Sequence, residues 1–169
     1  MANDPGPSDW NNPARRYKWF RPRQAARGGV PKTTPSAGTF FTVSLYNSST
    51  GATVLVLRDW SISGAGADLT ALGYNKGRLT GTNYPAQSFF PGDSAPAGLV
   101  DYQSAAAALT GDYYTTLNST AGGLWPHDFP FAIVPPGWAF FMCITIAAAF
   151  GQAGFLWEEI SIDELDYFY

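Results

Sequence analysis

The sequence predicts an all-β protein, a jelly-roll-like β-sandwich with an extended N-terminal arm. Apolar residues recur at every second position in several stretches, which is the period of a half-buried strand. The 169 residues include 18 glycines and 13 prolines, which divide the chain into short segments and leave little room for long helices. The first 38 residues are basic and rich in proline, which predicts an arm outside the body.

Charge is divided unevenly along the chain. Residues 1–35 hold seven Lys/Arg and two Asp, a net charge of +5, whereas residues 36–169 hold three Lys/Arg and eleven Asp/Glu, a net charge of −8. Aromatic residues make up 16% of the chain and charged residues 14%, a composition typical of a protein that buries surface against partners. We therefore expect a basic arm (residues 1–38), an acidic body (39–162) and an acidic, aromatic tail (163–169).

The arm carries six prolines, a density that is expected to exclude a helix or a central strand. Basic and aromatic residues are interleaved within it. The arm residues expected to bind a partner are Arg15, Arg16, Tyr17, Lys18, Trp19, Phe20, Arg21, Arg23 and Arg27. Their composition suits single-stranded nucleic acid, an acidic lipid surface or another protein, the last through aromatic and arginine anchors. A solvated basic tail without a partner is the remaining alternative.

Two β-hairpins are expected in the body. In the first, residues 39–46 and 52–62 form the strands, and the polar cluster from Asn47 to Gly51 forms the turn between them. The second lies within residues 129–162, the stretch around which the sandwich core is expected to form.

Within this second stretch, Pro136 and Gly137 suit a type II turn, because proline presets the first φ and glycine takes a positive φ at the second position. An apolar run over residues 138–150 then alternates with a period of two. A glycine break at 151–154 is expected to turn the chain into the last strand. The run is long enough to cross a membrane, but its period and the glycine break favour strands.

Further short strands and a terminal segment complete the predicted organisation. Strands are expected near residues 77–80, 98–103, 113–117 and 131–134, which brings the total to roughly eight, the number of a jelly roll. The chain ends in Tyr167, Phe168 and Tyr169, which we interpret either as a frayed end or as a strap that packs on a neighbouring subunit.

The residues that could carry catalysis are few. His127 is the single histidine and stands beside Asp128, but no Gly-x-Ser-x-Gly motif supplies a nucleophile. One histidine and one cysteine, Cys143, do not make a usual zinc site, and the cysteine is expected to be a buried apolar residue. Glu158 and Glu159 are neighbours on a strand and point to opposite faces, so they do not form a glycosidase pair. We expect no enzyme, no cofactor and no metal.

Two segments resemble small virion proteins of tailed bacteriophages. Residues 44–57, Ser-Leu-Tyr-Asn-Ser-Ser-Thr-Gly-Ala-Thr-Val-Leu-Val-Leu, resemble the Leu-x-Asn-Pro-x-Gly-Ser/Thr-Gly hairpin of that class. Val134-Pro-Pro-Gly-Trp, together with Phe155-Leu-Trp-Glu-Glu-Ile, resembles its closing hairpin. The resemblance covers well under half of the chain, and this sequence has Ser48 where proline is usual and an unmatched middle.

The resemblance implies a capsid decoration (cement) protein of a phage head, or a related fibre or collar component. It would be made in the host cytoplasm, assemble as a homo-oligomer with a trimer favoured, and bind the major capsid protein on the virion surface through its arm. No small-molecule substrate and no membrane are expected. One alternative is a carbohydrate-binding fibre or tail module that uses Trp125 and loop tyrosines. A second is a nucleic-acid-binding protein that uses the basic arm.

Overall fold

The computed structural model describes residues 25–64, 69–89, 92, 94–107, 112–118 and 132–163. These residues contain no α-helix and form eleven β-strands. The strands are β1 (Ala25–Thr33), β2 (Phe40–Asn47), β3 (Thr53–Gly64), β4 (Leu69–Lys76), β5 (Thr82–Tyr84), β6 (Gln87–Ser88), β7 (Gly98–Ala105), β8 (Asp112–Asn118), β9 (Ala132–Val134), β10 (Trp138–Ile144) and β11 (Gly151–Ser161).

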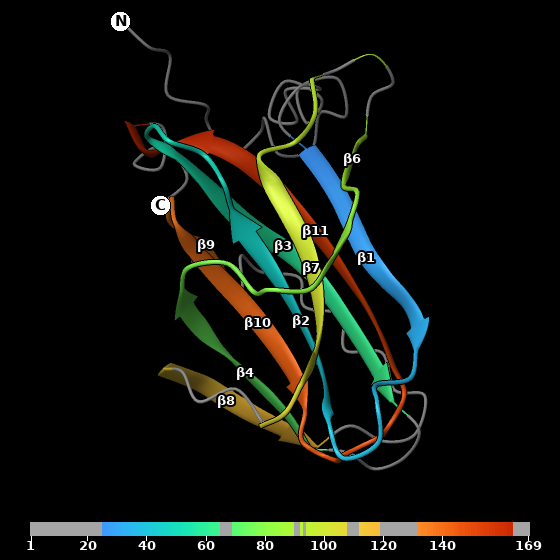
Figure 1. Ribbon diagram of the computed structural model, residues 1–169. Helices are drawn as coiled ribbons and strands as arrows, with labels where there is room; N and C mark the ends of the chain where they lie inside the picture. Colours follow the sequence, from blue (N-terminus) through green and yellow to red (C-terminus); the bar gives the residue numbers. More distant parts are fainter. Residues whose placement is uncertain are drawn as a thin grey trace, which may run out of the picture.

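The strands form two antiparallel sheets packed face to face, as Figure 1 shows. Sheet A has the order β6-β1-β11-β3-β9, and sheet B has the order β5-β7-β2-β10-β4-β8. Four nested pairs underlie both sheets, because β1 pairs with β11, β2 with β10, β3 with β9 and β4 with β8. Strands β1 to β4 and β8 to β11 thus form one long antiparallel ribbon. Rolling up this ribbon places β11 beside β3 and β10 beside β4, which is a jelly-roll arrangement and confirms the predicted fold class.

The core fills the space between the sheets. Its largest fully buried side chains include Trp60 and Trp157 from sheet A and Phe41 and Phe140 from sheet B. Burying each side chain of this size stabilises the fold by about 1.5–3 kcal/mol. The predicted period of two holds here: Phe140, Met142 and Ile144 face the core, and Phe155 and Trp157 meet them from the other sheet.

Neither predicted hairpin forms, although most of the predicted strands do. β2 lies in sheet B and β3 in sheet A, and the same is true of β10 and β11, so each turn crosses between the sheets instead of pairing its two strands. The hairpin prediction was wrong because strand alternation is a local signal, whereas the pairing partners lie far apart in the sequence. In a jelly roll, successive strands of the ribbon alternate between the two layers.

Asn47 connects two turns that cross between the sheets, the one from β2 to β3 and the one from β9 to β10. Its Nδ2 donates hydrogen bonds to the carbonyls of Thr53 (2.9 Å) and Val134 (2.9 Å), and its Oδ1 accepts one from the Ser49 N–H. The backbone N–H of Gly137 donates to the Asn47 carbonyl at 2.9 Å. Gly137 has a φ of +77°, as the predicted turn requires. The turn therefore forms as expected, but it leads from sheet A to sheet B.

The predicted arm boundary is wrong for residues 25–33, which form β1 inside sheet A. β1 pairs with β11 from Ala25 opposite Glu158 to Thr33 opposite Gly151. Pro31 falls at the irregularity between Val30 and Thr33, where a missing N–H costs no ladder bond. A Cβ on Gly28 would lie 2.7 Å from Val100 Cγ2, so the glycine lets β1 approach the core closely. The sandwich therefore includes residues 25–33, which precede its predicted start at Thr39.

Two further expectations need correction. The glycine break at residues 151–154 is part of β11, and the turn before it occupies residues 145–150, where Ala148 takes a φ of +59°. No strand forms at residues 77–80, since β4 ends at Lys76 and β5 begins at Thr82. Strands do occur at the other three positions, as β7, β8 and β9. No helix in the described part of the chain is long and apolar enough to cross a membrane.

Candidate functional site

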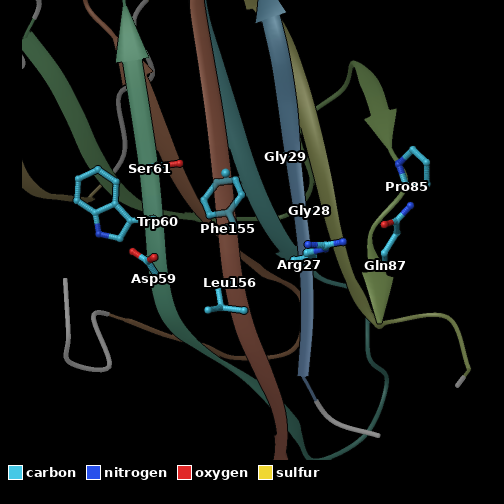
Figure 2. Close-up of a pocket in the computed structure, with 11 residues that line it drawn as sticks. Arg27, Gly28, Gly29, Asp59, Trp60, Ser61, Pro85, Gln87, Phe155 and Leu156 are labelled. Atoms are coloured by element: carbon cyan, nitrogen blue, oxygen red, sulfur yellow. The ribbon is translucent and has the colours of Figure 1, made fainter. Parts of the chain in front are cut away.

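A shallow groove of about 420 Å³ lies on the outer face of sheet A (Figure 2). Phe155 and Trp60 belong to the core, so their neighbours along β11 and β3 face away from it. In the registers of these strands, Gly29, Gly154 and Ser61 lie side by side across three strands. These small residues leave the backbone bare, and the groove runs over it.

The next row along the same strands forms one wall of the groove. It consists of Arg27 on β1, Leu156 on β11 and Asp59 on β3. Figure 2 shows Arg27 and Asp59 on opposite sides of β11, with Gln87 and Pro85 beyond β1. The Asp59 Oδ1 atom is buried and accepts no hydrogen bond. Because a cation and a carboxylate flank an apolar leucine, the wall has no net charge.

Both basic residues of β1 lie against aromatic rings. The guanidinium carbon of Arg27 lies 5.6 Å from the centroid of the Phe89 ring, and Lys32 Nζ lies 4.2 Å from that of Phe150. Phe89 is 45% exposed, one of the most exposed large apolar residues described. Contacts of this kind orient a cation while leaving its N–H donors available to another group.

Two other arginines are held by carboxylates. Arg58 donates through Nε and a terminal nitrogen to Glu158 Oε2, at 2.9 and 2.6 Å. Arg78 donates to both oxygens of Asp101 at 2.7 Å, and Asn83 donates to Asp101 Oδ1 at 3.1 Å. The hydrogen bonds to Asp101 raise the pKa of Arg78, so this arginine stays charged. Each ion pair attaches two neighbouring segments to each other, and in each the positive charge of the arginine is matched by a carboxylate.

Arg27 is the only residue of the predicted partner-binding set that lies in the described part of the chain. It sits on β1 at the wall of the groove. The rest of the arm cluster, residues 15–23, lies outside the described residues, as do Tyr167, Phe168, Tyr169, Trp125 and His127. The groove and Lys32 were not predicted from the sequence. The small residues of the groove floor look like turn signals until the strand register is known.

Glu158, Glu159 and Cys143, which were considered for catalysis, form hydrogen bonds or ion pairs within the fold. Glu158 pairs with Arg58, whereas Glu159 accepts hydrogen bonds from the Gly98 N–H (3.0 Å) and from Trp157 Nε1 (3.2 Å). Cys143 is buried, as expected, with the Thr42 hydroxyl 3.3 Å from its sulfur. Among the described residues, no three His, Cys, Asp or Glu side chains gather closely enough to hold a metal ion.

Comparisons with protein-family models, with curated proteins and with solved structures yield no match to this chain. The interpretation of the groove and of β1 therefore rests on their own geometry.

Proposed function

We propose that this chain is a non-enzymatic structural protein of a phage virion, a decoration protein that binds the outer surface of an assembled capsid. The observation that supports this proposal is the position of β1. The residues that follow the basic, aromatic cluster do not continue as a free arm but enter sheet A between β6 and β11. A load on the arm would pass directly into the sandwich through the pairs between β1 and β11.

The resemblance of residues 44–57 to phage virion proteins suggests which assembly is decorated. A jelly roll occurs in capsid proteins and in lectins alike, so the fold by itself does not select the function. The basic cluster, with five Lys/Arg in residues 15–23, suits an acidic surface of the major capsid protein. A subunit that binds only the assembled shell stabilises that shell by mass action.

Co-sedimentation with empty capsids tests this proposal. Because β1 begins at Ala25, a chain of residues 25–169 removes the basic cluster and keeps every described strand. We expect the full chain to pellet with the shells and the shortened chain to stay in the supernatant, with unchanged far-ultraviolet circular dichroism. Equal pelleting of both chains would contradict attachment through the arm.

A further inference from the structure

The outer side of β1 presents two cations that have no carboxylate partner among the residues the structure describes. Arg58 and Arg78 are each bonded to a carboxylate, whereas Arg27 and Lys32 contact the rings of Phe89 and Phe150. β1 itself contains no acidic residue. Lys32 is five positions after Arg27 along the strand, a distance of at most about 17 Å. We call these four side chains, with the adjoining groove, the β1 surface.

The β1 surface combines charge with an apolar recess. The groove floor is bare backbone at Gly29 and Gly154, and Leu156 supplies an apolar wall beside Arg27. Phe89 lies next to Arg27 with nearly half of its surface exposed. An occupant that matches this surface would carry carboxylates and at least one large apolar side chain.

The chain contains such a segment at its own end. Residues 163–169, Asp-Glu-Leu-Asp-Tyr-Phe-Tyr, hold three acidic residues, three aromatic residues and no basic residue. Their charge is opposite to that of Arg27 and Lys32, and their aromatic side chains are of the type that anchors protein interfaces.

The strand geometry favours a tail from a second molecule. Arg27 lies opposite Leu156, and Ile162, whose N–H bonds the Ala52 carbonyl, is six residues further along, about 20 Å away. Lys32 lies beside the Gly151 end of β11, some eleven residues from Ile162, or about 36 Å. Asp166, the last acidic residue of 163–169, is only three positions beyond Asp163, about 10 Å when fully extended. A chain's own tail therefore cannot bring acidic residues to both cations.

We propose that the C-terminal tail of one copy binds the β1 surface of a neighbouring copy, with its carboxylates on Arg27 and Lys32 and an aromatic ring in the groove. If each copy places its tail on the next, and the rotation between copies closes, the copies form a ring. If two copies exchange tails, they form a dimer. The contact joins copies of this chain and does not depend on capsid attachment. A nucleic acid suits the surface less well, because residues 36–169 carry a net charge of −8 that repels a polyanion.

Sedimentation velocity of the full-length protein over a range of concentrations measures this contact. We expect the wild-type protein to associate, and the double variant Arg27→Glu, Lys32→Glu to associate at least about tenfold more weakly, because attraction becomes repulsion. Removal of residues 164–169 should weaken association to a similar extent. Lys76→Glu is the matched control: it reverses an exposed lysine on sheet B, and association should stay at the wild-type level.

A charge exchange identifies the occupant. Asp163→Lys, Glu164→Lys and Asp166→Lys, placed in the background of the double β1 variant, should restore association. A wild-type protein that stays monomeric would overturn the inference. So would a tail deletion that leaves association unchanged, or a charge exchange that fails to restore it while both charge variants fold normally. Binding of single-stranded DNA that is lost in the double β1 variant but unaffected by tail deletion would assign the surface to nucleic acid instead. Capsid co-sedimentation is measured separately, so failure of either proposal leaves the other standing.

Discussion

Arg78 and Arg27 are both arginines on the outside of the sandwich, but they have opposite surroundings. The Arg78 side chain is 43% exposed, yet a buried Asp101 fixes it through two hydrogen bonds, and Asn83 joins the same carboxylate. Arg27 has a phenylalanine ring beside it instead of a carboxylate. The difference shows that one cation of the acidic body holds a loop and two strands together, whereas the other has only an aromatic contact among the described residues.

The contrast between the two arginines depends on β1 being packed in the sandwich. Substitution of Gly28 tests this packing and has the largest expected effect. Gly28→Val adds a side chain whose Cβ would lie 2.7 Å from Val100 Cγ2 and 3.4 Å from the Trp157 ring. We expect a loss of about 3 kcal/mol in the free energy of unfolding, measured with urea. Gly51→Val is the control, because a Cβ there meets nothing within 4 Å. Equal effects of the two substitutions would show that β1 does not pack in the sandwich.

Alanine substitution distinguishes a charged residue held in an ion pair, Asp101, from one that contacts only an aromatic ring, Arg27. Asp101→Ala removes both acceptors of Arg78 and one of the two acceptors of Asn83, which keeps its hydrogen bond to the Val100 carbonyl. Because Arg78 can turn towards water, the expected loss is about 2 kcal/mol rather than the larger cost of a fully buried pair. Arg27→Ala should change the free energy of unfolding by less than about 0.5 kcal/mol. Chemical denaturation of both variants checks this ordering. A loss for Arg27→Ala as large as that for Asp101→Ala would remove the distinction.

The smallest expected effect concerns Tyr102, on the same strand as Asp101 but facing the core. Burial raises the pKa of its phenol, with a hydrogen bond to Ser104 acting in the opposite direction. The folded state therefore keeps this proton to higher pH than the unfolded state does, and stability falls as the pH rises above about 10. Tyr102→Phe should make that fall shallower in a pH series of thermal unfolding curves. An unchanged slope would exclude Tyr102 as a source of the alkaline loss.

The fold class and most of the strands could be predicted from the sequence because the period of two is a local pattern. Phe140 and Met142 face the core as that pattern requires. The pairing of strands could not be found in the same way. Asn47 has the composition signal of a turn, but its role in joining two crossings depends on Val134, which lies 87 residues away in the sequence. β1 was not predicted because glycine and proline normally interrupt a strand. Here Gly28 allows close packing on the core, and Pro31 falls at the irregularity in the pairing of β1 with β11.

The candidate site was predictable only in part, for a related reason. Arg27 was identified from its basic context, but Lys32 and the groove depend on the placement of β1 beside β11 and on glycines from separate strands. Asp101 had no signal at all, because Arg78 and Asn83 reach it from a loop and from a different strand. The remaining arm and tail residues lie outside the described part of the chain, so their binding roles stay predictions.

Attachment of the sandwich to an acidic protein surface is proposed to depend on the basic cluster, residues 15–23. The most direct test of this dependence is the affinity for empty capsids of a full-length variant in which Arg15, Arg16, Lys18, Arg21 and Arg23 are all changed to glutamine. We expect this variant to bind at least about a hundredfold more weakly than the wild-type protein, with a reduced dependence on salt concentration. Affinity within about twofold of the wild-type value would contradict it.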